Sequence, residues 1–145
     1  NETINQLTYL KENNLLNRLH SIEKVKKIPN YSDVSETINN RARAYLDVNC
    51  AHCHQEGGSA KTSGLHLVFQ EQNKYRIGVN KPPVAAGKGS GNLSFDIVVG
   101  QPDASILLYR MKHLEPDIVM PEIGKNLVHK EGVKIIEEWI ASLEE

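Results

Sequence analysis

The sequence predicts an all-α protein in which helices are separated by long loops. Three observations indicate this class. Apolar residues recur at helical spacing in several stretches, the segments between them are rich in Gly, Pro, Asn and Ser, and only residues 65–69 have the composition of a short strand or an irregular segment. A length of 145 residues fits one domain with a short extension.

The composition excludes several classes of protein. Lys and Arg number 17 against 18 Asp and Glu, so the net charge of −1 lacks the basic footprint of a nucleic-acid-binding protein. No apolar run approaches the length of a transmembrane segment. The chain begins with Asn1 rather than Met, and we expect it to be a processed product or a piece of a longer protein.

Residues 1–34 are predicted to be an N-terminal helical extension and linker, followed by a domain that covers residues 35–145. Helical periodicity runs over residues 1–20 and is interrupted at Asn13 and Asn14, whereas residues 21–34 have the composition of a connector. We interpret the extension as a packing helix rather than a binding element.

The domain begins with a helix whose N-cap is Ser35 or Thr37, and the helix leads directly into residues 50–54. Residues 70–95 are predicted to be mostly loop. A further helix is expected over residues 104–114, with Pro102 near its first position or Asp103 as its cap, and the last helix runs from about Lys130 to the C-terminus. The buried stripe of that last helix is predicted to contain Gly132, Ile136, Trp139, Ile140 and Leu143.

Such a domain has a thin apolar core. About 110 residues with this much loop usually need a covalent staple, a metal or a large buried cofactor. The only two cysteines lie in the string Cys50-Ala51-His52-Cys53-His54, which is C-x-x-C-H, the attachment signature of a c-type haem. Two residues three apart on a helical turn face the same side, so both sulfurs can bond one porphyrin edge while His54 reaches the iron.

Other uses of the two cysteines fit less well. A thioredoxin-like site follows a strand, whereas a helix is predicted before Cys50. A zinc site needs a second ligand pair, and the remaining histidines are scattered singly. A structural disulfide between Cys50 and Cys53 is disfavoured because such close pairs are usually redox-active. We therefore predict one covalent haem c, with His52 facing solvent.

The sixth iron position has several candidate ligands. Met120 lies in a loop directly before a proline, and we favour it over Met111, which fits the apolar stripe of a helix. His113 and His129 are further alternatives, and so is a vacant site. Coordination by His54 and Met120 would close the iron to external ligands, which suits electron transfer.

The order of helix, C-x-x-C-H, loops, helix, methionine loop and C-terminal helix resembles a class I-type cytochrome c domain. The resemblance covers residues 35–145 and implies the cytochrome c fold, in which helices and long loops wrap one covalently attached haem. It implies attachment through Cys50 and Cys53 and axial ligation by His54 and Met120. In that family the first and last helices cross through small and aromatic residues. The matching candidates here are Ala42, Leu46 and Trp139.

A narrower likeness concerns residues 41–50, 81–87 and 103–107, which resemble the C-terminal haem domain of larger bacterial extracytoplasmic proteins. The resemblance implies a one-electron carrier, or an electron-relay domain or subunit of a larger redox system, rather than an enzyme. The partner is expected to be a redox protein or an adjacent redox domain. The expected compartment is the bacterial periplasm, and membrane association through a missing segment or a partner stays open.

Two other functions remain as alternatives. One is a haem enzyme or gas sensor with an open or displaceable sixth site. The other is a docking fragment of a redox complex, in which residues 1–34 form much of the contact. Arg76, Lys88 and Arg110 are candidates for pairing with haem propionates, although a solvated surface role is favoured for each.

Overall fold

The computed structural model describes residues 4–19 and 21–144. Within these residues the chain is helical, without strands and with only two isolated bridges, from Val79 to Ile97 and from Phe95 to Ser105. The predicted all-α class is therefore confirmed for the described part of the chain. Residues 65–69, for which the sequence left a strand or an irregular segment open, are irregular.

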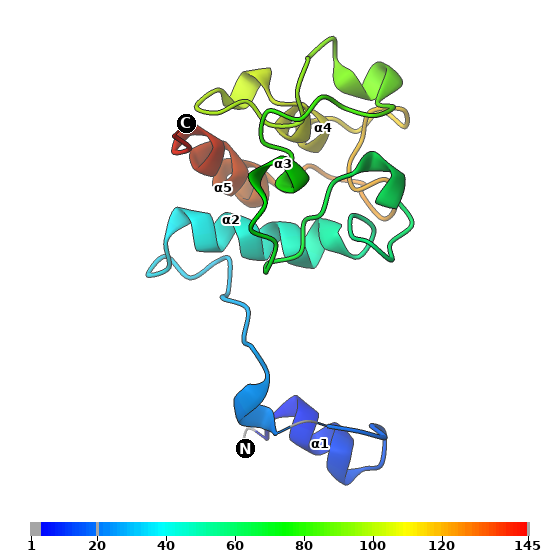
Figure 1. The fold of residues 1–145 in the computed structure, drawn as a ribbon, viewed down its shortest axis with the longest axis vertical. Coiled ribbons are helices and arrows are strands. Elements are labelled where there is room, and N and C mark those ends of the chain that lie inside the picture. The colour runs from blue at the N-terminus through cyan, green and yellow to red at the C-terminus, as the bar shows by residue number, and fades with distance from the viewer. Residues whose placement is uncertain (1–3, 20, 145) are drawn as a thin grey trace.

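The helices are short and joined by long loops (Figure 1). The α-helices are α1 (Gln6–Glu12), α2 (Ile38–Leu46), α3 (Lys74–Ile77), α4 (Ile106–Lys112) and α5 (Lys130–Ala141). A π-helical turn, Asp47–Ala51, continues α2, and 3-10 turns cover Ile22–Lys24, Lys61–Ser63, Gly87–Ser90 and Pro102–Ala104.

The N-terminal extension contains a shorter helix than the periodicity of residues 1–20 predicts. The side chain of Asn5 caps α1 by accepting hydrogen bonds from the amides of Leu7 and Thr8. The helix ends at the Asn13-Asn14 pair, where Asn14 adopts a φ of 56°. Residues 1–3 and 20 of the predicted helix lie outside the described residues. A helix of this length is marginal without tertiary packing.

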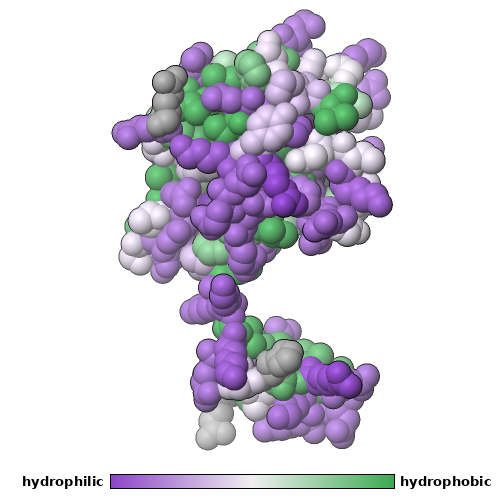
Figure 2. Space-filling view, viewed as in Figure 1, coloured by the Kyte–Doolittle hydropathy of each residue, from purple (hydrophilic) through white to green (hydrophobic). Residues whose placement is uncertain are grey.

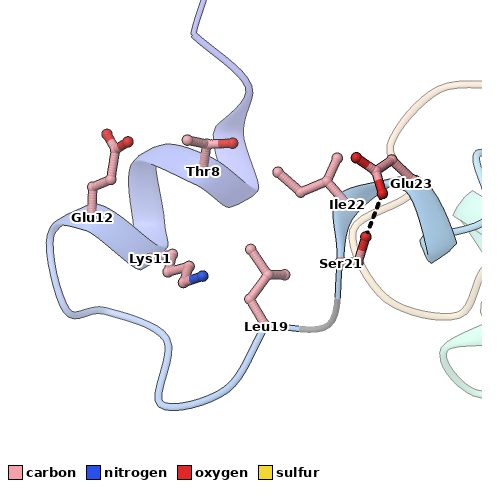
Figure 3. A pocket seen from close by; sticks show the side chains of 7 residues that line it. All are labelled: Thr8, Lys11, Glu12, Leu19, Ser21, Ile22 and Glu23. Atoms are coloured by element: carbon pink, nitrogen blue, oxygen red, sulfur yellow. Dashed lines mark hydrogen bonds between the residues drawn. The ribbon is translucent and has the colours of Figure 1, made fainter.

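The extension does not pack as the sequence predicts. Helix α1 has no buried residue and contributes nothing to the core cluster. Figure 1 shows it apart from the domain, at the end of an extended segment, and Figure 2 shows the same separation as two lobes. Leu19 and Ile22 face the helix around an open pocket of about 510 Å³ (Figure 3). The expected packing helix therefore buries none of its residues, and the side chains that it presents to this pocket are Thr8, Lys11 and Glu12.

Helices α2 and α5 cross in the centre of the domain. Ala42, Leu46 and Trp139 are all buried there, as the sequence predicts. Tyr45 and Gly132 also approach closely at this crossing, because a Cβ placed on Gly132 would lie 2.2 Å from the Tyr45 ring. The core around this crossing consists of Ala42, Tyr45, Leu46, Ala51, Leu67, Ile77, Ile97, Leu108, Met111, Ile135, Ile136, Trp139 and Ile140.

The helix boundaries agree with the sequence in part. Thr37, and not Ser35, caps α2 through a hydrogen bond from the Asn40 amide, and α5 begins at Lys130 as predicted. Helix α4 is shorter than the predicted 104–114. Pro102 starts a separate 3-10 turn, and Asp103 makes no cap but lies 3.3 Å from the ammonium of Lys112.

A buried ion pair fixes the long connection between α3 and α4. The Lys81 ammonium lies 3.0 Å from the Asp96 carboxylate, and both residues are buried. Backbone hydrogen bonds join Asn80 to Ile97 and Asp96 to Lys81 across the same loop. Such a pair is costly to break, because one charge would remain buried without its partner. The connection is therefore a closed, defined loop.

Candidate functional site

The C-x-x-C-H motif lies on a continuous helical turn at the end of α2. The amides of Cys53 and His54 both donate to the carbonyl of Cys50, at 3.1 and 2.9 Å. This geometry turns the side chains of Cys50 and Cys53 toward the same side. Both are free thiols, half-buried rather than exposed.

Neighbouring loop residues hold this turn in place. The amide of Phe69 donates to the Asp47 carboxylate at 2.7 Å, and the amide of Leu67 donates to the carbonyl of His54 at 2.9 Å. The irregular segment 65–69 thus runs along the motif and satisfies its backbone groups. Because this segment is not part of a β-sheet, the amide of Phe69 has no strand partner and donates to the Asp47 carboxylate of the π-helical turn instead.

The hydroxyl of Ser63 lies between His54 and the carbonyl of Ala60. Ser63 Oγ donates to the carbonyl of Ala60 at 2.8 Å, and the same oxygen lies 3.0 Å from Nδ1 of His54. A neutral His54 that donates from Nδ1 to Ser63 has its lone pair on Nε2. Within the described residues, Nε2 has no hydrogen-bond partner, which leaves it available to a metal.

The electrostatic environment favours the neutral imidazole. Burial lowers the pKa of His54 below its usual value, and the charges of Arg110 and His52 lower it further. Burial also raises the pKa of the Cys50 thiol to about 12, with Cys53 adding to the effect. Cysteine pairs that exchange disulfides have lowered pKa values, so this thiol does not fit a thioredoxin-like site.

Gly58 permits the tight turn that follows the motif. A Cβ on Gly58 would lie 2.1 Å from the carbonyl oxygen of Cys53, which is itself fixed by a hydrogen bond from Ala60. The neighbouring Gly57 has nothing within 4 Å of the same position. A Cβ atom therefore fits at Gly57 but not at Gly58.

We expect Gly58→Ala to lower the free energy of unfolding by about 2 kcal/mol or more, because backbone atoms cannot rotate away from the new methyl group. Gly57→Ala should change it by less than about 0.5 kcal/mol. Denaturant unfolding of both variants checks the pair. Equal stabilities would show that the chain does not turn back on Cys53 in this way.

Met120 lies in the loop between α4 and α5. Its amide donates to the carbonyl of Arg110 at 3.2 Å, and Arg110 Nε donates to the carbonyl of Ile118 at 2.9 Å. In Figure 1 this orange loop lies on the same side of the domain as the turn after the C-x-x-C-H motif. Arg110 also lowers the pKa of His54, so one residue both contacts the Met120 segment and acts on His54.

The three arginine and lysine candidates for propionate pairing differ in position. Arg110 is half-buried, and a Cβ on Gly89 would lie 3.0 Å from its guanidinium. Arg76 is paired with Glu71 at 3.3 Å, away from this loop. Lys88 makes only an exposed pair with Asp117 at 3.7 Å. Of the three, Arg110 alone also lowers the pKa of His54.

The other candidate ligands also have defined positions. Met111 is buried in the core, as expected for a helical methionine. His113 donates from Nδ1 to the carbonyl of Tyr109 at 2.7 Å, whereas His129 stacks on Tyr45 with its Nδ1 3.1 Å from the phenol oxygen. His52 is exposed, as predicted. His113 and His129 therefore remain alternatives to Met120 that experiment must separate.

Sequence reasoning missed two residues of the site region. Ser63, which orients His54, lies in a run of small polar residues typical of any loop. Lys125 lies five residues after Met120, and its ammonium bonds the carbonyl of Met120 at 3.0 Å. Neither residue belongs to a motif, and only a spacing to His54 or Met120 could have indicated them.

The described residues contain no group of three or more His, Cys, Asp and Glu side chains placed to hold a metal ion. None of the helices in this part of the chain combines the length and the apolar character that a membrane crossing requires. Comparisons with protein-family models, curated proteins and solved structures found no match to this chain.

Proposed function

We propose that this chain is a cytochrome c-like domain that carries one haem c and transfers single electrons. The hydrogen bonding of His54 carries the proposal. Its Nδ1 lies 3.0 Å from Ser63 Oγ, and we take this nitrogen as the protonated one, which leaves Nε2 as the free nitrogen next to the two unpaired cysteines. An imidazole fixed by a partner on Nδ1 is the usual state of a metal-ligating histidine. A structural disulfide has no need of it, and a thiol catalyst would need a lowered cysteine pKa, whereas burial raises that of Cys50.

Each residue of the site has a role in this proposal. Cys50 and Cys53 form the two thioether bonds, and His54 is the proximal ligand. Met120 is the distal ligand, supplied by the loop between α4 and α5. The haem, when bound, supplies the one-electron chemistry, while the chain supplies ligand identity, burial and dielectric. The thin core of the domain is consistent with a fold completed by a large cofactor.

Electron transfer fits the residues better than substrate chemistry. A thioether ligand at the sixth position leaves the iron no open site. The near-zero net charge predicts weak long-range steering, so the reaction rate with a redox partner should depend only mildly on salt. Because thioether attachment of haem takes place outside the cytoplasm, we place the domain in an extracytoplasmic compartment, the bacterial periplasm.

The deciding experiment is a visible spectrum of the reduced protein, produced in a periplasm that attaches haem, with and without carbon monoxide. A c-type spectrum that carbon monoxide leaves unchanged supports a covalent, six-coordinate haem. A spectrum that shifts at once favours the haem enzyme or gas sensor instead. A chain that is exported intact but carries no covalent haem overturns the proposal.

Ser63→Ala tests the orientation of His54 directly. Removal of the acceptor on Nδ1 makes the imidazole less basic, which weakens ferric iron binding more than ferrous binding. We expect the reduction potential to rise, by about 59 mV for each tenfold loss of relative ferric affinity. Redox titration measures the change. Ser59→Ala is the control, since Ser59 is exposed in the same loop, and an equal potential in both variants would exclude the role of Ser63.

A further inference from the structure

Lys125 gathers three backbone carbonyls around its ammonium. It donates to the carbonyl of Met111 at 2.6 Å, to that of Met120 at 3.0 Å and to that of Arg110 at 3.5 Å. The Arg110 and Met111 carbonyls belong to the last turn of α4, and the Met120 carbonyl belongs to the loop. One side chain therefore joins the end of the helix to the residue proposed as the distal ligand.

The end of α4 is a suitable anchor for a cation. The last carbonyls of a helix lack partners within the helix and carry the negative end of its dipole. Hydrogen bonds from a charged donor to such carbonyls are stronger than those between neutral groups.

Two further hydrogen bonds hold the loop that contains Met120. One is made by the backbone of Met120 itself, and the other is made to Ile118, before Met120 in the chain. The amide of Met120 donates to the carbonyl of Arg110 at 3.2 Å, and Arg110 Nε reaches Ile118 at 2.9 Å. Residues 122–124, between Met120 and Lys125, are exposed, and Ile123 is 87% exposed. Without Lys125, the segment after Met120 would have little to hold it on α4.

We propose that Lys125 is a positioning residue that holds the Met120 loop on the C-terminal end of α4 and so limits how often the sixth iron position opens. The inference rests on the proposed function, because it takes Met120 as the distal ligand. It assigns Lys125 no contact with the iron.

The test compares Lys125→Gln with the unaltered holoprotein. In the ferric state, the rate of imidazole binding at saturating imidazole equals the rate at which Met120 leaves the iron. We expect this rate to rise at least about tenfold in Lys125→Gln, since a charged donor with three acceptors is lost. Lys125→Arg keeps a charged donor and should lie between the two. Lys134→Gln is the control, because Lys134 is exposed on α5 and pairs only with Glu138.

Denaturant unfolding of the same variants separates a general loss of stability from the proposed role, because the imidazole rate in Lys125→Gln should rise by more than the change in the free energy of unfolding explains. An unchanged imidazole rate in Lys125→Gln overturns the inference and leaves the haem assignment intact. Absence of covalent haem in the unaltered chain defeats the proposed function instead.

If Lys125→Gln does not accumulate, acetylation of the unaltered holoprotein decides the question. Lys125 should react about tenfold or more slowly than Lys134, and its modification should accompany loss of the Met120 ligand. Equal acetylation rates would contradict the proposed role.

Discussion

Met120→Ala is expected to bind carbon monoxide at least about a hundredfold more tightly than the unaltered ferrous protein. The reason is competition for one position on the iron. If Met120 occupies that position in 99% of molecules, the apparent affinity for an external ligand falls by the same factor of about a hundred. Removal of the thioether leaves the site open, while attachment through Cys50 and Cys53 and ligation by His54 persist. Equilibrium titration with carbon monoxide measures the difference.

The chain contains only one other methionine, which provides a matched control. Met111→Leu conserves volume in the core at a cost of less than about 1.5 kcal/mol and should leave carbon monoxide affinity unchanged. A Met120→Ala variant that still excludes carbon monoxide would show that another residue is the sixth ligand. His113 and His129 are then the residues to replace next.

The sequence predicted the class of fold and the position of the motif because both depend on local patterns. The spacing of apolar residues indicated α2 and α5, and Pro and Gly placed the loops. The sequence analysis overestimated the length and the packing of the helix in the N-terminal extension. The spacing of apolar residues shows which face of a helix could be buried, but not whether another part of the protein covers that face. Leu15, Leu16 and Leu19 continue the apolar pattern, yet the Asn13-Asn14 pair ends the helix before them.

The candidate ligands could be proposed from the sequence, whereas the contacts that surround them could not. Cys50, Cys53 and His54 form a contiguous motif whose chemistry is read directly from the residues. The hydrogen bond from His54 to Ser63 depends on a turn that brings the chain back after nine residues. The buried pair of Lys81 and Asp96 depends on a closure over fifteen residues. Neither closure leaves a periodic trace, so only the folded chain shows them.

Gly132→Ala is expected to destabilise the domain by about 2 kcal/mol or more, although the helix propensity of the new residue acts in the opposite direction. In an exposed helix interior, replacing Gly by Ala gains about 1 kcal/mol. Here the added Cβ would lie 2.2 Å from the ring of Tyr45, and overpacking of a core costs about 1–3 kcal/mol, more when the neighbour cannot move. The sign of the change therefore reports whether α2 and α5 cross at this pair. Denaturant unfolding measures it.

The surroundings of Tyr45 explain why its ring cannot yield to a methyl group. Its edge packs on Tyr31 with ring centroids 5.3 Å apart, its face stacks on His129, and only 5% of the residue is exposed. Relief must therefore come from a smaller residue at position 45. The double variant Gly132→Ala with Tyr45→Leu should recover part of the loss, so that the two changes are not additive. Additive losses would show that the ring does not contact Gly132. A Gly132→Ala variant that is more stable than the unaltered protein would show that α2, the helix that leads to Cys50, does not cross α5 at this pair.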